Sequence, residues 1–167
     1  PPADRYPVQT FVMEHNNAIV DDAIRREVER GGQVYYLHNR VETIDQCAGA
    51  LRRRIPGLSV AVAHGQMGEG EMSKIWARLC EQEANVLVCT TIIETGVDVP
   101  NCNTLIIENA DCFGLSQLHQ LRGRVGRGKA KSYCILTSHN KNPETLRRLK
   151  ALCKTTDGFQ IAEEDLQ

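Results

Sequence analysis

Residues 17–37 read NAIVDDAIRREVERGGQVYYL, a helical pattern that ends in two glycines and passes directly into a strand pattern. The same alternation repeats along the rest of the chain. Strand patterns cover residues 8–13, 33–37, 58–63, 85–89, 104–107 and 132–136, and helical patterns cover residues 17–30, 41–54, 69–81, 115–122 and 143–153. Because parallel strands need a crossover that is usually helical, this order predicts an α/β fold of three layers, with a mainly parallel sheet between helices.

The length of 167 residues favours one well-buried domain. Residues 1–7 contain three prolines, which is too many for a helix or a central strand. We therefore expect residues 1–7 to be an interdomain linker that runs in from the upstream part of a longer protein.

Composition limits the partners that the chain can have. With 20 Lys and Arg against 21 Asp and Glu, the net charge is -1, so binding to nucleic acid must come from local patches. The seven cysteines show no CxxC pair or zinc-like spacing, and we expect free thiols and no metal site. No apolar run approaches the ~20 residues of a membrane span, and the N-terminus has no signal-peptide pattern. These features predict a cytoplasmic protein with no membrane partner.

Polar clusters follow several of the predicted strands. His38, the pair His64-Gly65 and the pair Thr90-Thr91 each come directly after one. In parallel sheets ligands gather beyond the carboxyl ends of strands, so we expect one end of the sheet to carry the chemistry. The threonines can offer hydroxyl and backbone donors to a phosphate. The His64 side chain and the Gly65 amide can donate hydrogen bonds to a nucleic-acid backbone. The alternative is that these two residues only form a structural turn.

Residues 117–127 read QLHQLRGRVGR and place three arginines, spaced by glycines, at the end of a helical pattern. A guanidinium group keeps its charge and presents a planar fork that matches phosphate oxygens, so this turn predicts a phosphate site. The alternative interpretation is that the arginines lie at the solvated end of a helix, where their positive charge interacts favourably with the helix dipole. Residues 123–130 almost match GxxxxGK[ST], but Ala130 replaces the hydroxyl that would hold magnesium, and the segment follows a helix. The chain alone is therefore expected not to hydrolyse a nucleotide.

The stretch TTIIETGVDVP at residues 90–100 follows the strand pattern of residues 85–89. Gly96 permits an unusual backbone turn that would direct Asp98 toward Arg124 and Arg127. The alternative is an ordinary turn in which Asp98 caps a local amide.

Four segments, taken in order, resemble the motifs of the second RecA-like lobe of superfamily 2 helicases and translocases. They are VYYLHN at 34–39, AHGQM at 63–67, TTIIETGVDVP at 90–100 and QLHQLRGRVGR at 117–127. The last two are most similar to double-stranded DNA translocases, the subgroup that contains the bacterial transcription-repair coupling factors and the RecG helicases. Residues 30–39 look more like the coupling factors. RecG is the alternative within the subgroup, and a non-catalytic nucleic-acid-binding module is the alternative outside it.

The resemblance implies a RecA-like, P-loop NTPase-type fold and half of a nucleotide site. Arg124 and Arg127 would be catalytic arginine fingers that reach the γ-phosphate, with Gln120 ordering their loop. Gly96 and Asp98 would lie near the nucleotide. ATP with Mg²⁺ would be bound mainly by the N-terminal RecA-like lobe of the same protein, which lies outside this chain.

The resemblance also implies contacts to double-stranded DNA. Thr90, Thr91, His64 and Gly65 would contact the phosphate backbone, so binding should not depend on base sequence. Residues 8–142 would form the helicase domain, and residues 143–167 would begin a helical translocation segment. RNA polymerase is an expected partner only through other parts of the protein.

Overall fold

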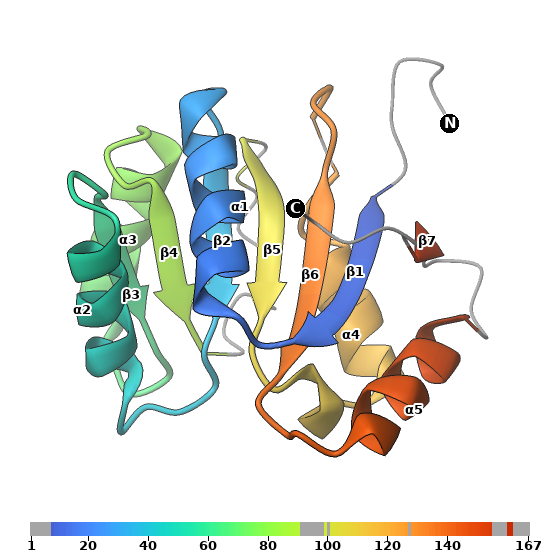
Figure 1. Ribbon diagram of the computed structural model, residues 1–167. Helices are drawn as coiled ribbons and strands as arrows, with labels where there is room; N and C mark the ends of the chain where they lie inside the picture. Colours follow the sequence, from blue (N-terminus) through green and yellow to red (C-terminus); the bar gives the residue numbers. More distant parts are fainter. Residues whose placement is uncertain (1–7, 91–98, 100, 127, 155–159, 162–167) are drawn as a thin grey trace.

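The computed structural model describes residues 8–90, 99, 101–126, 128–154 and 160–161 of the chain (Figure 1). The strands are β1 (Gln9–Glu14), β2 (Gln33–Leu37), β3 (Val60–Ala63), β4 (Val86–Cys89), β5 (Cys102–Ile107), β6 (Tyr133–Ser138) and β7 (Gln160–Ile161). The helices are α1 (Asn17–Glu29), α2 (Ile44–Arg54), α3 (Glu69–Cys80), α4 (Leu115–Arg122) and α5 (Pro143–Lys154), with a short 3₁₀ helix at Ala110–Cys112.

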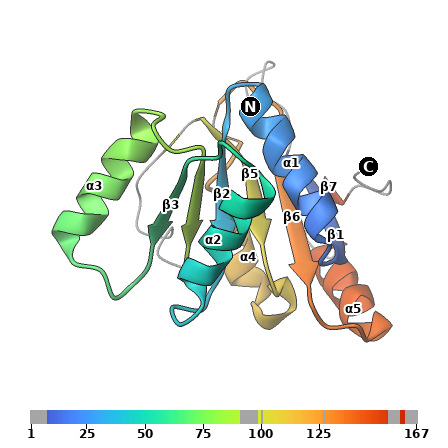
Figure 2. The same cartoon turned by 60° about the vertical axis from the view of Figure 1, so that its left-hand side comes forward.

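The strands form one sheet in the order β3-β4-β2-β5-β6-β1-β7, and all the described pairings are parallel (Figures 1 and 2). The predicted α/β fold with a parallel sheet is therefore confirmed. Because the strands run in one direction, their carboxyl ends share one edge of the sheet and their amino ends share the opposite one. We call these the carboxyl edge and the amino edge.

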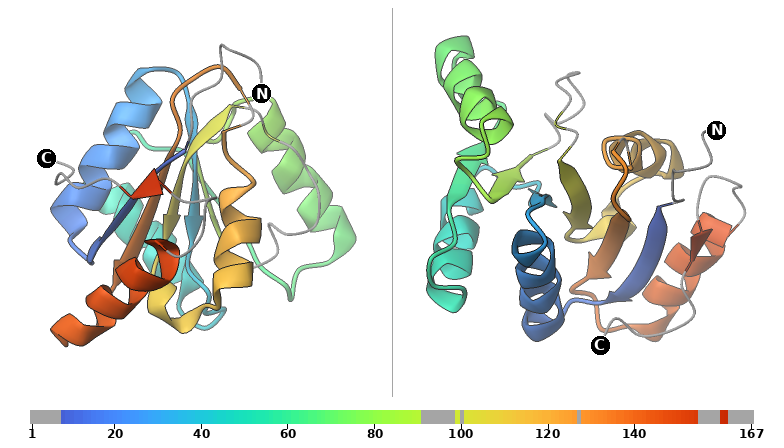
Figure 3. Two further views of the ribbon diagram at one scale, coloured as in Figure 1. Left: turned by 90° about the vertical axis from the view of Figure 1, so that its right-hand side faces the viewer. Right: turned by 90° about the horizontal axis from the view of Figure 1, so that it is seen from above.

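Alternate residues of each strand enter two separate hydrophobic clusters, as the pleat of a strand requires. Tyr35 on β2 packs in a cluster with side chains from α3, α4 and α5, whereas its neighbour Tyr36 packs in a cluster with α1 and α2. Figure 3 shows α1 and α4 on opposite sides of the central strands. The three predicted layers are confirmed.

Two local features differ from the sequence pattern. The helix expected from residue 41 begins at Ile44, because the Thr43 amide donates to the Arg40 carbonyl in a turn, and the Thr43 hydroxyl bonds to His38. β7 was not expected, and it extends the sheet by pairing with β1. None of the described helices has both the length and the apolar character needed to cross a bilayer.

A buried ion pair ties the end of α1 to the sheet near the amino edge. Glu27 is 2% exposed and accepts two hydrogen bonds from Arg30, at 2.7 and 2.6 Å, and one from the Thr104 hydroxyl at 2.6 Å. A Cβ atom at Gly32 would lie 1.9 Å from a Glu27 oxygen. Glycine at position 32 thus makes room for the carboxylate, and Arg30 supplies the charge that balances it.

Candidate functional site

The arginine turn follows α4 and precedes β6, so it lies at the amino edge of the sheet. The Arg124 amide donates to the Leu121 carbonyl at 3.0 Å, and the Val125 amide donates to the Arg122 carbonyl at 3.2 Å. The side chain of Val125 is 4% exposed and enters the core shared with α3, α4 and α5. The turn is therefore anchored to the domain immediately beside Arg124, which is half-buried.

Of the two glycines Gly123 and Gly126 in this turn, only Gly126 has a backbone conformation that favours glycine over other residues. Gly126 has φ +83°, and a Cβ atom there would lie 2.8 Å from Cγ2 of Val8. Gly123 has the helical φ of -64°, and its closest Cβ contact would be 3.4 Å from the Gln120 carbonyl. Gly126 thus fixes the path of the chain after Arg124 against the start of β1.

The other residues expected near the nucleotide are only partly described. Gln120 lies exposed on α4, in the turn of helix before Arg124. Arg127, Gly96 and Asp98 lie outside the described residues, so the expected approach of Asp98 to the arginines stays a prediction. Burial raises the pKa of the Tyr35 hydroxyl, and the positive charge of Arg124 lowers it in part. The Arg124 guanidinium is therefore close enough to Tyr35 on β2 for their charges to interact.

His64, Gly65 and Thr90 lie at the carboxyl edge, after β3 and β4. The Nδ1 atom of His64 accepts a hydrogen bond from the Gln66 amide at 3.3 Å, so a neutral ring carries its proton on Nε2 and can donate there. Thr90 is 6% exposed, and its amide donates to the Ala63 carbonyl. The Thr90 amide is therefore not available to a ligand. Thr91 lies outside the described residues.

The arginine turn does not lie at the end of the sheet where we expected the chemistry. Polar residues that follow strands meet at the carboxyl edge. Arg124 instead precedes the strand β6, and therefore lies at the amino edge. The candidate site is divided between the two edges of the sheet, because α4 returns the chain from one edge to the other.

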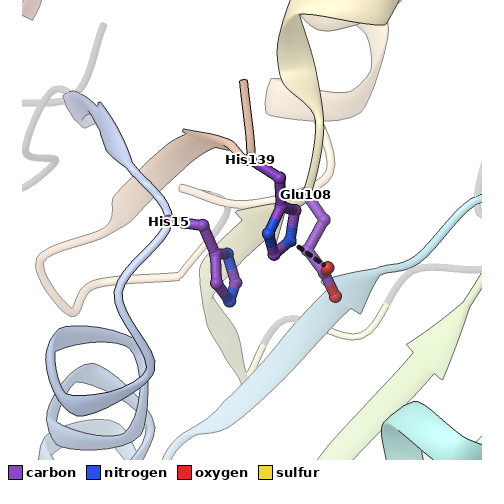
Figure 4. Close-up of side chains that lie close together, drawn as sticks. All are labelled: His15, Glu108 and His139. Carbon is purple, nitrogen blue, oxygen red and sulfur yellow. Dashed lines mark hydrogen bonds and ion pairs between the residues drawn. The ribbon is translucent and has the colours of Figure 1, made fainter. Parts of the chain in front are cut away.

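A third polar cluster at the carboxyl edge was missed in the sequence. Glu108 follows β5 and is largely buried. One of its oxygens lies 3.1 Å from Nδ1 of His38, and the other lies 2.9 Å from Nε2 of His139. These side chains line a pocket of about 240 Å³ together with His15, whose ring stacks on that of His139 with centroids 4.1 Å apart (Figure 4). The histidines showed no common spacing in the sequence that would have indicated this.

The protonation of this cluster is set by burial and hydrogen bonding. Burial alone would raise the pKa of Glu108, but hydrogen bonds from His38, Tyr36 and His139 outweigh it and lower the pKa to about 2. Burial lowers the pKa of His15 by more than the nearby Glu108 raises it. Glu108 is therefore a carboxylate and His15 a neutral imidazole at neutral pH.

Comparison with known proteins identifies the family of this domain. The sequence profile of the helicase conserved C-terminal domain matches residues 15–129. The chain belongs to this helicase domain family. It is 50% identical to the transcription-repair-coupling factor of Escherichia coli (strain K12) and 47% identical to that of Myxococcus xanthus, over the full chain in both cases. It spans 15% and 14% of these two relatives.

Among solved structures, this helicase domain is similar to RecG bound to a three-way DNA junction, with a TM-score of 0.79 and 35% sequence identity. The match covers 95% of this chain and 22% of the RecG chain. The RecA-like fold that the sequence motifs imply is therefore confirmed.

The anchoring of the arginine turn can be tested by adding a methyl group at each glycine. Gly126→Ala should lower the free energy of unfolding by about 2–3 kcal/mol, because its positive φ disfavours alanine and its Cβ would overlap Val8. Gly123→Ala, in a helical conformation, should change it by less than about 0.5 kcal/mol. Urea denaturation followed by circular dichroism measures both. Val8→Ala should recover part of the loss in Gly126→Ala only, and an equal loss at both glycines would contradict the assignment.

The buried carboxylate predicts a pH-dependent stability. Glu108 has its pKa lowered from 4.5 to about 2 on folding, so its ionised form stabilises the folded state above pH 4.5 by about 3 kcal/mol, and this contribution disappears as the pH falls toward 2. Glu108→Gln should therefore be less stable than the parent by about 3 kcal/mol at pH 7, and the difference should shrink by pH 3. Denaturation midpoints at several pH values, measured with a chelator present, test this.

The matched control is Glu14→Gln, which removes an exposed carboxylate from the same edge of the sheet. Its stability should follow the parent at every pH. A pH-independent loss in Glu108→Gln would show that the carboxylate matters by its shape and not by its charge.

Proposed function

We propose that this chain is the second motor lobe of an ATP-dependent double-stranded DNA translocase that acts in transcription-coupled DNA repair. The observation that carries the proposal is the identity of 47–50% to transcription-repair-coupling factors over the whole chain. These relatives are about seven times longer, so ATP hydrolysis, DNA tracking and any contact with RNA polymerase belong to the assembled protein. Its place is the cytoplasm of a bacterial cell.

At the amino edge, the proposed role is to complete a nucleotide site. ATP with Mg²⁺ binds mainly on the N-terminal RecA-like lobe, and Arg124 and Arg127 approach the γ-phosphoryl group when the lobes close. Guanidinium groups held on a fixed turn stabilise the charge that develops there without further reorganisation. The anchoring of Val125 and Gly126 supports this role, because an arginine finger must be positioned before the reaction begins. Gln120, Gly96 and Asp98 complete the proposed site.

At the carboxyl edge, the proposed role is to hold the DNA backbone. The Nε2 donor of His64, the exposed Gly65 and the hydroxyls of Thr90 and Thr91 suit phosphate oxygens, which position a protein on DNA without reading its sequence. Closing and opening of the lobes around ATP would then move this edge along the duplex.

A RecG-type branch-migration helicase is the second candidate, favoured by the structural similarity to RecG bound to a three-way junction. The identity to RecG is 35%, against 47–50% for the coupling factors. A non-catalytic nucleic-acid-binding module is a different class of function. That alternative predicts that the arginines matter for DNA affinity and not for the rate of ATP hydrolysis.

The arginine assignment is tested in the protein that contains this lobe together with its N-terminal partner lobe. Arg124→Ala and Arg127→Ala should each lower DNA-stimulated ATP hydrolysis by about 10³-fold. Arg124→Lys should fail as well, because an ammonium group lacks the planar fork. Arg53→Ala, at an exposed arginine on α2, is the control and should keep the parent rate. Rates within a few-fold of the parent in the Arg124 and Arg127 variants would refute the finger role.

The DNA contact of His64 makes a separate prediction. His64→Ala should weaken binding to DNA by about tenfold, equally for unrelated base sequences, because one hydrogen bond to a charged phosphate is lost. A neutral imidazole displaces no counterion from DNA, so an unchanged dependence of affinity on salt would assign the contact to the neutral ring and a shallower one to the imidazolium. Fluorescence anisotropy over a salt series measures both quantities, with His119→Ala on α4 as the control. Unchanged affinity with lower stability would support the structural-turn interpretation of His64.

A further inference from the structure

Three side chains with metal-ligating atoms meet at the carboxyl edge, and one of them is Glu108, whose other oxygen bonds to His38. His15 follows β1, Glu108 follows β5 and His139 follows β6 (Figure 4). Their ligand atoms all lie within 4.8 Å of one another. The sheet creates this group, because β6 pairs with both β5 and β1 in parallel register and brings the three strand ends side by side.

Two of the three donor atoms already face each other as ligands of one ion do. Nε2 of His139 and Oε1 of Glu108 are 2.9 Å apart, and both can bind one ion at the usual metal–ligand distances of about 2.0–2.2 Å. His38 bonds to the other oxygen of Glu108, which leaves Oε1 directed at His139. Nε2 of His15 lies 3.2 Å from Oδ1 of Asn17, so binding an ion exchanges this exposed hydrogen bond for a metal–nitrogen bond and turns the ring out of its stack on His139.

Hydrogen bonds around the cluster orient these donors, as outer contacts do in metal sites. Nδ1 of His15 lies 2.9 Å from the Thr137 hydroxyl. The same pattern recurs at His38, whose Nε2 lies 2.7 Å from the Thr43 hydroxyl. The His15 ring and, through His38, the Glu108 carboxylate thus have partners outside the three proposed ligands, and the pocket that they line has room for an ion with bound water.

We propose that His15, Glu108 and His139 form a binding site for one divalent transition-metal ion of the zinc type, with His38 and Thr137 as positioning residues. Two imidazoles and one carboxylate make up a set of donors that zinc accepts, with a remaining position for water. The ion joins the carboxyl ends of β1, β5 and β6. This inference does not depend on the proposed motor function.

A second group, made of His38, Cys47 and Glu108, competes for the same carboxylate. Cys47 and His38 both bond to Oε2 of Glu108, so this oxygen is already occupied, whereas Oε1 faces His139. Sγ of Cys47 lies 3.6 Å from Oε2 and acts as a donor to it. The nitrogen and oxygen donors of His15, Glu108 and His139 are therefore favoured over a site that contains the thiol.

The test begins with the metal-free chain, which is titrated with Zn²⁺ in a calorimeter. In a second experiment, Co²⁺ replaces Zn²⁺ as a spectroscopic probe of the ligands. The parent should bind one equivalent of Zn²⁺, unfold at a higher temperature in its presence, and give a Co²⁺ spectrum without thiolate-to-metal absorption. His15→Gln and His139→Gln should each weaken binding by about 100-fold or more and lose the thermal shift. His119→Gln, at a histidine outside the cluster, should behave as the parent.

Each other outcome overturns the proposal. Equal Zn²⁺ binding in the parent and in His139→Gln would show that the ion sits elsewhere, for example on the exposed thiols of Cys80 and Cys112. A thiolate-type Co²⁺ spectrum that disappears in Cys47→Ser would assign the ion to the competing group. Absence of binding in a parent chain that folds normally by circular dichroism would leave a hydrogen-bonded carboxylate network and no metal site.

Discussion

The parallel pairing of all the described strands is the constraint on which the rest of the structure depends. A parallel sheet places all carboxyl ends at one edge, so each connection must carry the chain back across the sheet before the next strand begins. Residues just after a strand and residues just before a strand therefore lie at opposite edges. The strand β6 has six residues, which separates the arginine turn from the carboxyl edge by roughly 20 Å at about 3.3 Å per residue. A single domain can thus contact two different partners at once.

The two edges are connected through packed and hydrogen-bonded elements. The arginine turn is held through Val125 in the core and through Gly126 against Val8 at the start of β1. At the other edge, amide hydrogen bonds link successive strands: Glu108 to Leu37, His38 to Cys89, and Thr90 to Ala63. A close-packed core transmits displacement instead of absorbing it. In the proposed motor, a movement of the arginine turn toward a nucleotide would therefore move the DNA-facing edge as part of the same body.

Sequence patterns predicted most of the fold, because alternating strand and helix periodicities depend only on neighbouring residues. They also found the arginine turn and the polar residues after β3 and β4, which belong to continuous motifs. They could not give the strand order, which depends on pairing between segments that are distant in the sequence. The cluster around Glu108 was missed for the same reason. Three of its side chains come from positions 15, 108 and 139, and the pairing of β1, β5 and β6 brings them together. The two-residue strand β7 is too short to leave a periodic pattern.

Two buried carboxylates, one near each edge, are neutralised in different ways. Glu27 is paired with Arg30, whose guanidinium keeps its charge at any physiological pH, so the end of α1 is fixed under all ordinary conditions. Glu108 is surrounded by imidazoles, which can change their protonation or bind a metal ion. Its amide is also the first in the series of hydrogen bonds that leads through His38 and Thr90 to the end of β3, next to His64. The carboxyl edge is thus the one whose charge can respond to its surroundings. A change there would reach the proposed DNA contacts through the backbone, whereas the amino edge would keep the arginine turn in place.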